Sequence, residues 1–591
     1  MLKRLIPTLL ILALCTALRA DDAVVSRFHA TLDNYYEEYL ALFPVEAAVN
    51  GDNDHRYEAV WPNDIGAEHR AQVAALCEKY LGTLAKYDRA ALSTTDQLSY
   101  DMLRWNLTLR REGLRQSLHL LPVNQFNCPT LVFAQMGSGT SAHPFNTAQD
   151  FRNFLSRARG FSVWVDTAIA NMQEGVAKGV VPPRILMERV LPQLEPLMAD
   201  DEAKNIFFGP LQKLPADLSA ADKDKLAADY RAGLRGIVLP AYARLHAFIR
   251  DEYLPHCRDT AGVGALPGGK ELYAYCVRLQ TTTALTPEQI HELGLHEVAR
   301  IRGEMEKVQA QVGFKGTLND FLKFVATDPQ FTPFKSEEEV LNGYRAIEVR
   351  VMANIPKFFG RVPRTKFEIR ATEAFRAAAA SAEYSAGAAD GTRPGIFYVP
   401  IVDARKFTTP RMEDLFLHEA IPGHHFQISL ALENTGLPRF RRCDASNAYV
   451  EGWALYTESL GRELGVYADP YQYLGMLFGD MHRAVRLVVD TGLHAKGWTR
   501  EQALAYGAEN EGGTPDKQQA EIERYMAWPG QALGYKIGQL KIRELRTRGE
   551  QQLGARFDLR GFHDEILREG AMPLAVLEAH IRAWLDQPAG H

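Results

Sequence analysis

The feature that most constrains this chain is a histidine-rich segment that cannot form a metal site on an unbroken helix. Residues 417–427 have the sequence Leu-His-Glu-Ala-Ile-Pro-Gly-His-His-Phe-Gln, so the next histidines follow His418 six and seven residues later. In the usual His-Glu-x-x-His helix, two histidines four residues apart bind one Zn²⁺ and the glutamate serves as general base. Histidines six residues apart on a continuous helix would be separated by roughly 9 Å along its axis. They could not share one ion.

A proline–glycine pair inside this segment provides a way to bring the histidines together. Pro422 has no N–H for the helix and disfavours the helical conformation of the residue before it, while Gly423 tolerates conformations that other residues avoid. The sequence therefore predicts a local break that places His424 or His425 back over His418. The alternative is a plain helix end and turn, with solvated or hydrogen-bonded histidines.

A second histidine pair fits metal binding less well. It lies in a segment that begins with Thr286, Pro287 and Gln289, the pattern of a capped helix start, and then continues without interruption. His291 and His296 are five residues apart on that helix, so their side chains diverge by about 140°. We do not expect them to share a metal.

A candidate third ligand lies in the aromatic helical segment 447–460. Glu451 and Glu458 are seven residues apart, so two helical turns place both carboxylates on one face. Two histidines and one glutamate form one of the ligand sets of catalytic zinc. The aromatic residues indicate burial, and buried carboxylates are rare unless they are paired or bound to metal. The alternative is a solvated helix face.

Four blocks along the chain resemble a known bacterial family. They are Asp390-Gly-Thr-Arg-Pro-Gly-Ile-Phe-Tyr, the His418 segment, Glu451-Gly-Trp-Ala-Leu-Tyr and Glu523-Arg-Tyr-Met-Ala-Trp-Pro-Gly-Gln-Ala. Together they resemble the family catalogued as bacterial domain of unknown function 885, over nearly the whole mature chain. Members of that family look like mostly helical, zincin-like metallopeptidases, similar to the angiotensin-converting-enzyme, thimet-oligopeptidase and thermostable-carboxypeptidase groups.

The motifs and the resemblance together give a ligand set. The helical peptidases carry a glycine directly before the second zinc histidine, which favours His424 over His425. We therefore expect Zn²⁺ to be held by His418, His424 and Glu451, with Glu419 as the general base.

The resemblance also implies residues that assist the site. Related helical peptidases use late tyrosines to stabilise the oxyanion, which favours Tyr525 as a catalytic residue and Tyr535 as the next candidate. His425, Glu458, Arg524 and Tyr535 are expected to support the ligands or to contact substrate. A purely structural ion pair or hydrogen bond is the alternative for Arg524.

Helical periodicity dominates the rest of the chain, which has 591 residues, 46% of them hydrophobic. We expect a mainly α, zincin-like peptidase fold with a deep cleft, an N-terminal helical region over 21–280 and a catalytic region over 281–591. Residues 366–402 differ, because they show β-type alternation that predicts a small sheet beside the zinc helix.

This sheet suggests a way to hold a peptide. An extended substrate can add its backbone to an exposed strand edge. Gly395, Ile396 and Phe397 lie in the candidate substrate strand. The alternative is a sheet that only packs under the helix.

The N-terminus predicts export. A basic start and an apolar run precede a plausible cleavage point, so residues 1–20 are expected to be a signal peptide. The mature protein would be periplasmic or secreted, without stable membrane insertion, because an uncleaved anchor would be short for about 20 spanning residues. A lipoprotein processed at Cys15 is the alternative, although the preceding Leu14 is bulky.

Charge and cysteine content narrow the remaining properties. A net charge of −6 and a pI near 6.3 give no reason to expect nucleic-acid binding. Five cysteines remain after signal cleavage, and Cys257 and Cys276 are the expected pair if a disulfide forms. The alternative is that all five are small apolar core residues.

The sequence thus predicts an exported zinc metallopeptidase that hydrolyses oligopeptides through water activated by Glu419. Two alternatives remain: a non-catalytic exported helical protein that binds peptides or envelope components, and a zinc amidase or esterase. Glu419 directly follows His418, which argues against a degenerate site.

Overall fold

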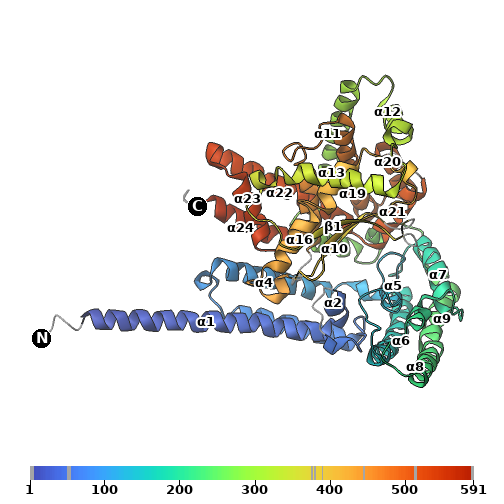
Figure 1. Cartoon of the computed structure of the whole chain (residues 1–591). Coiled ribbons are helices and arrows are strands. Elements are labelled where there is room, and N and C mark those ends of the chain that lie inside the picture. Colours follow the sequence, from blue (N-terminus) through green and yellow to red (C-terminus); the bar gives the residue numbers. More distant parts are fainter. Residues whose placement is uncertain are drawn as a thin grey trace.

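The computed structural model describes residues 6–49, 55–373, 377, 381–388, 391–442, 446–511 and 515–587. Over these residues the chain is mainly helical, with one small sheet, as the sequence predicted (Figure 1). The zincin-like character of the fold stays a prediction.

Ten α-helices lie before residue 285 in the described part of the chain, and all but the last of them form the lower part of the molecule in Figure 1. They are α1 (Ile6–Leu42), α2 (Pro44–Val49), α3 (Ala67–Leu84), α4 (Thr94–Gly113), α5 (Pro129–Met136), α6 (Ala148–Lys178), α7 (Arg184–Met198), α8 (Ala220–Gly233), α9 (Leu239–Phe248) and α10 (Gly269–Thr281). Two π-helical turns, Leu234–Val238 and Ile249–Tyr253, flank α9.

The later helices carry the residues that the sequence assigned to the site. They are α11 (Pro287–Gln311), α12 (Leu318–Thr327), α13 (Glu337–Met352), α14 (Ile355–Phe358), α15 (Met412–Glu419), α16 (His424–Glu433), α17 (Arg439–Arg442), α18 (Asn447–Glu458), α19 (Pro470–Ala495), α20 (Arg500–Glu511), α21 (Pro515–Ala527), α22 (Gly534–Leu553), α23 (Leu559–Arg568) and α24 (Leu574–Leu585). The boundary proposed near residue 280 stays a prediction.

The sheet has three strands, β1 (Phe367–Ala371), β2 (Glu383–Ser385) and β3 (Gly395–Val399), in the order β1-β3-β2. β1 is parallel and β2 antiparallel to β3. The expected substrate strand at Gly395, Ile396 and Phe397 is therefore the central strand. Because Ile396 and Phe397 are paired with β1 on one side and with β2 on the other, a peptide cannot add to this strand, and that prediction is wrong. Within the described residues, the free edges of the sheet belong to β1 and β2.

The sheet lies beside the helices of the histidine segment, as predicted. Phe397 of the central strand packs against Tyr344 of α13, with ring centroids 5.2 Å apart. Phe367 of β1 faces Phe416 of α15 at 6.3 Å and His425 of α16 at 4.9 Å. These aromatic contacts fix the position of α15 and α16 relative to the strands.

The carboxylate-bearing helix α18 packs closely on α22. A Cβ atom added to Gly538 of α22 would lie 1.8 Å from the carbonyl oxygen of Ala448 on α18, and Gly452 faces Gly538 at the same crossing. Only glycine allows the two backbones to approach so closely. The crossing therefore sets where α18 can place Glu451.

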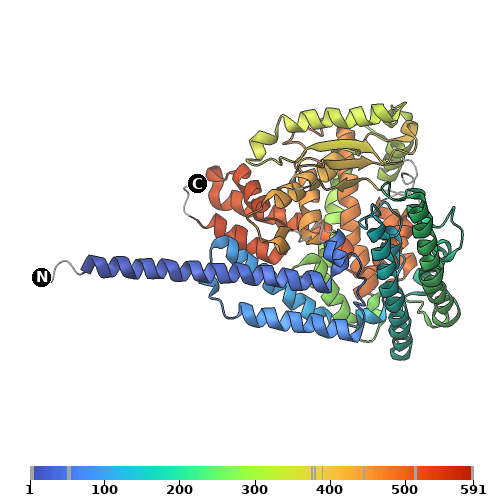
Figure 2. The same ribbon diagram turned by 60° about the horizontal axis from the view of Figure 1, so that its bottom comes forward.

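The N-terminal part of α1 extends away from the other helices (Figures 1 and 2). The expected signal peptide, residues 1–20, includes the start of this helix. Among the residues that were placed, no helix is both long and apolar enough to span a bilayer.

The predicted cysteine pair does not form. Cys257 and Cys276 are both free thiols and both are buried, as are Cys77 and Cys128. Cys257 follows a helical turn and Cys276 lies inside α10, where burial raises the thiol pKa. These four cysteines therefore act as small core residues. Cys443 lies outside the described residues.

Candidate metal centre

The predicted helix break is present. Helix α15 ends at Glu419, α16 begins at His424, and the four residues between them include a cis peptide bond before Pro422. A Cβ atom on Gly423 would lie 1.9 Å from the carbonyl oxygen of His418 and 2.3 Å from that of Leu417. The turn therefore folds back so tightly that position 423 has room only for glycine.

Helix α18 is hydrogen bonded to the break itself and to the helix that precedes it. The indole Nε1 of Trp453 donates to the carbonyl oxygen of Pro422 at 2.9 Å. The hydroxyl of Thr457 donates to the carbonyl oxygen of Leu417 at 2.8 Å. Both side chains are fully buried. Since α18 also carries Glu451, these bonds fix that carboxylate relative to the two histidines.

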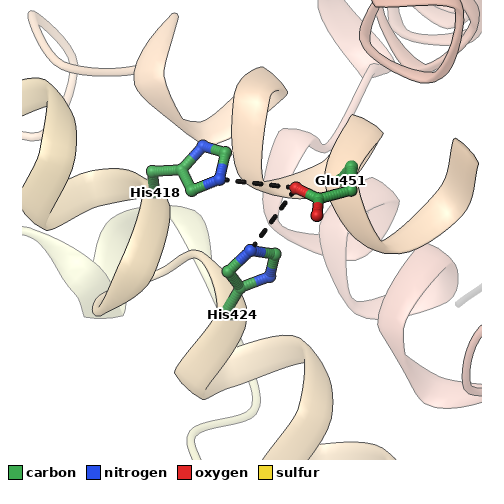
Figure 3. Close-up of side chains that lie close together, drawn as sticks. All are labelled: His418, His424 and Glu451. Atoms are coloured by element: carbon green, nitrogen blue, oxygen red, sulfur yellow. Dashed lines mark ion pairs between the residues drawn. The ribbon is translucent and has the colours of Figure 1, made fainter. Parts of the chain in front are cut away.

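Three predicted ligands converge at the break (Figure 3). Oε2 of Glu451 lies 3.5 Å from Nε2 of His418 and 3.6 Å from Nε2 of His424. The two imidazole rings are nearly perpendicular, with centroids 4.9 Å apart. Among the described residues, His418, His424 and Glu451 form the group of His, Cys, Asp or Glu side chains that could hold a metal ion.

The geometry of this triad suits zinc. Ligand atoms about 2.0–2.1 Å from a tetrahedral ion are about 3.3 Å from one another, close to the 3.5 and 3.6 Å that separate Oε2 of Glu451 from the two imidazole nitrogens. Oε2 of Glu451 is buried and has no hydrogen-bond partner, nor does Nδ1 of His424. Buried polar atoms are normally satisfied. A cation between the three side chains would satisfy Glu451.

The triad is electrostatically coupled. Burial opposes ionisation of His418, but its contacts with Glu451 and Glu458 outweigh burial and raise the pKa of His418 to about 10. Burial likewise opposes ionisation of Glu451, yet the two imidazoles hold the pKa of Glu451 well below its usual value. The carboxylates of Glu451 and Glu458 thus favour the protonated form of His418. A metal ion would displace that proton, because histidine ligates in its neutral form.

Glu458 accepts a hydrogen bond from the ring nitrogen of His418 that does not face the other two triad residues. His418 Nδ1 donates to Oε1 of Glu458 at 2.8 Å, and the Glu458 side chain is almost fully buried. Such a carboxylate fixes the ring orientation and leaves Nε2 free to ligate. The seven-residue spacing of Glu451 and Glu458 therefore places one carboxylate at each ring nitrogen of His418, as their shared helix face suggested.

Glu419 follows His418 at the end of α15 and is buried. Burial raises its pKa, the electrostatic interactions with His418 and His424 oppose this rise, and the negative charge of Glu451 adds to it. No hydrogen bond is described for its carboxylate. The side chain is thus uncommitted beside the triad, as a general base requires.

His425 faces away from the triad. Its Nδ1 lies 3.0 Å from the hydroxyl of Tyr384 on β2 and 3.3 Å from that of Ser429. Burial lowers the pKa of His425 to about 4, so its ring is neutral at pH 7. The structure thus places His424, not His425, with His418 and Glu451. His425 instead connects α16 to the sheet.

The predicted tyrosines belong to a separate polar cluster. The Tyr525 hydroxyl donates to Glu521 at 2.8 Å and accepts from Arg486 at 3.1 Å. Arg524 donates to Gln531 at 2.7 Å, and its guanidinium lies 3.5 Å from the Tyr535 hydroxyl. No contact between these tyrosines and the triad is described, so their catalytic roles remain predictions.

Sequence reasoning missed the residues that hold the turn at Pro422 and the partner of Tyr525 in its polar cluster. Trp453 and Thr457 belong to the aromatic block that drew attention to Glu451, but nothing in their spacing indicates a bond to the turn. Glu521, the partner of Tyr525, lies four residues before it on α21. Because side chains four residues apart on a helix are neighbours, this contact could have been predicted from the sequence. Asp390, in the first of the four family blocks, lies outside the described residues.

The other candidate positions do not form metal sites within the described ranges. Thr286 and Gln289 make the predicted capping box of α11. His291 is buried against Thr491 at 2.8 Å, whereas His296 is exposed, so they diverge as expected. Two surface cavities, of about 720 and 680 Å³, contain no triad residue. The deep cleft over the zinc helix therefore stays a prediction.

Comparison with known proteins places this architecture in a family. The structure resembles the crystal structure of the putative lipoprotein from Colwellia psychrerythraea, with a TM-score of 0.85, 31% identity and coverage of 95% of this chain and 99% of that one. It also shares its fold with a putative lipoprotein of unknown function from Shewanella oneidensis, with a TM-score of 0.75, 19% identity and coverage of 95% and 100%. No curated protein matches the sequence. The model of the family "Bacterial protein of unknown function (DUF885)" matches residues 44–581, and the chain therefore belongs to that family.

Proposed function

We propose that this protein is an exported zinc-dependent peptidase that hydrolyses oligopeptides. The observation that carries the proposal is the convergence of His418 Nε2, His424 Nε2 and Glu451 Oε2 within 4.8 Å of one another. Two histidines and one glutamate leave the fourth position of a tetrahedral zinc open for chemistry. Glu419, which directly follows His418, supplies a carboxylate next to the triad.

Each residue has a distinct part in this chemistry. His418, His424 and Glu451 would hold the zinc ion, which when bound would supply a Lewis acid for the scissile carbonyl and for the attacking water. Glu419 accepts the proton of the attacking water and passes it to the leaving amine. Glu458 keeps His418 in the orientation that presents Nε2. Trp453 keeps the turn closed, so that His424 remains opposite His418.

The first test is metal content. Purified protein is expected to contain about one zinc per chain by atomic spectroscopy, and His418→Ala is expected to lose most of it. His425→Ala is the matched control, because that ring is buried nearby but lies outside the triad. Equal zinc content in the His418→Ala variant and the control would exclude this ligand assignment.

The second test is hydrolysis. A peptide library digested by the wild-type protein and analysed by mass spectrometry is expected to show cleavage. Glu419→Gln should retain zinc and lose cleavage, because it removes the base without removing a ligand. A cleaving Glu419→Gln variant would exclude the mechanism.

Two alternatives give different results in the same assays. A zinc amidase or esterase would keep zinc and leave the peptides intact while cleaving other amides or esters. A non-catalytic peptide- or envelope-binding protein would cleave none of these substrates.

A further inference from the structure

A surface cavity is lined by residues from two stretches of the chain, 183–270 and 493–526. Its volume is about 720 Å³. The walls come from the start of α7, the connection that leads into α10, the end of α19 and the start of α20. This volume is in the range of small-molecule sites, roughly 300–1,000 Å³. None of the residues that we assign to the metal centre lines it.

The charged lining of this cavity is predominantly basic. Five Lys or Arg side chains contribute to the wall against three Asp or Glu side chains: Arg184, Arg258, Lys270, Lys496 and Arg500 against Glu188, Asp259 and Glu501. The second cavity, by contrast, has three arginines and three acidic side chains: Arg361, Arg556 and Arg568 with Asp558, Asp564 and Glu565. A cation in a concave, partly apolar wall attracts anions where no carboxylate neutralises it.

Two of these cations have no carboxylate partner among the described contacts. Arg258 donates only to neutral oxygens, at 2.9 Å to the carbonyl of Val181 and at 3.1 Å to the hydroxyl of Thr260, and also to the Thr260 carbonyl. Lys270 is exposed and has no described ion pair. Lys496 and Arg500, in contrast, pair with Glu288 and Glu523.

Arg258 remains charged under physiological conditions. The side chain is half-buried, and burial without a carboxylate lowers its pKa to about 10. Because that pKa lies well above 7, the protein holds a partly desolvated guanidinium whose charge no described carboxylate neutralises. Such a group interacts more strongly with an anion than a fully solvated one does.

We propose that this cavity binds a small organic anion, with its carboxylate or phosphate group at Arg258 and Lys270 and its apolar part against Leu493, Trp498 and Met526. Arginine recognises both oxyanions through paired N–H donors, and the lysine adds a point charge. The site is separate from the triad, so the proposal does not rest on peptidase activity.

The test is calorimetric titration of the full chain at low ionic strength with phenyl phosphate, benzoate and neutral benzyl alcohol. We expect at least one of the two anions to bind and the alcohol not to bind, and the stronger of the two anions identifies the oxyanion. Arg258→Gln and Lys270→Gln should each weaken binding by about tenfold, the usual value of a charged hydrogen bond. Lys270 is exposed, so its substitution leaves the fold intact.

Two control variants complete the experiment. Arg89→Gln removes an exposed arginine that already pairs with Asp101 and should bind as the wild type does. His418→Ala should also bind as the wild type does, because the triad is not part of the cavity. The proposal is overturned if neither anion binds, if the Arg258 and Lys270 variants bind with unchanged affinity, or if His418→Ala abolishes binding.

Discussion

Replacement of Gly423 by alanine tests whether the tight turn builds the metal centre. The added methyl group would meet the carbonyl oxygens of His418 and Leu417 at 1.9 and 2.3 Å. Both atoms belong to the backbone of the last turn of α15, so no side chain can rotate to make room. The turn must open, and His424 must then move away from His418.

Two opposing effects set the change in the free energy of unfolding of Gly423→Ala. Overpacking of this kind costs up to about 3 kcal/mol, or more where backbone must shift. Alanine also restricts the unfolded chain, which offsets about 0.4–1 kcal/mol of that cost. We therefore expect a net loss of about 2 kcal/mol in the free energy of unfolding. Zinc affinity should fall at least about tenfold, because 1.4 kcal/mol of lost binding energy already has that effect.

The assay is urea denaturation, followed by circular dichroism, together with zinc competition against a chelator. Gly303→Ala in α11 is the matched control, since a Cβ atom there meets nothing within 4 Å. That variant should gain about 1 kcal/mol from helix propensity. If Gly423→Ala retained wild-type stability and zinc affinity, the close approach of the turn would not be what positions His424.

Three further substitutions test other parts of the structure. Glu458→Gln should weaken zinc binding by about tenfold in a chelator competition, because His418 loses a charged partner. Burial raises the pKa of Asp490 to about 7, so the folded state retains a proton that the unfolded chain releases near the ordinary aspartate pKa of 3.8. The contribution of Asp490 to stability therefore falls as pH rises through this interval, by up to about 4 kcal/mol. Urea midpoints measured at pH 5 and pH 8 should differ less in Asp490→Asn than in the wild type, and an equal difference would refute this. Arg441→Met should cost about 3–5 kcal/mol in urea denaturation, since it removes the fully buried arginine that pairs with Glu569 at 3.1 Å and leaves that buried carboxylate with the longer, 3.5 Å contact to Arg568; a wild-type midpoint would contradict this.

Several features of the fold could be predicted because their causes are local. The capping box at Thr286 depends on residues within four consecutive positions, Thr286 to Gln289, and the structure confirms it. The break between His418 and His424 was predictable because proline lacks an N–H and glycine lacks a side chain. The small sheet near residues 366–402 was indicated by its alternating pattern. The zincin-like relationship and the chemistry remain predictions.

Long-range pairing could not be predicted in the same way. The segment around Gly395 was correctly expected as a strand, but its place in the centre of the sheet depends on which strands pair with it. Cys257 and Cys276 are close in sequence, yet the structure buries both as free thiols. Sequence separation carries no information about side-chain direction in the folded chain.

The amino-acid sequence by itself determined the residues of the candidate centre: the ligand types, the helix break and the two carboxylates on one helix face. Only the tertiary structure decided that His424, and not its neighbour, completes the group with His418 and Glu451. The reason is that α18 donates a hydrogen bond from Trp453 to the turn and packs on α22 where Gly452 faces Gly538. Both constraints join segments distant along the chain, and the local sequence pattern does not encode the distance between them.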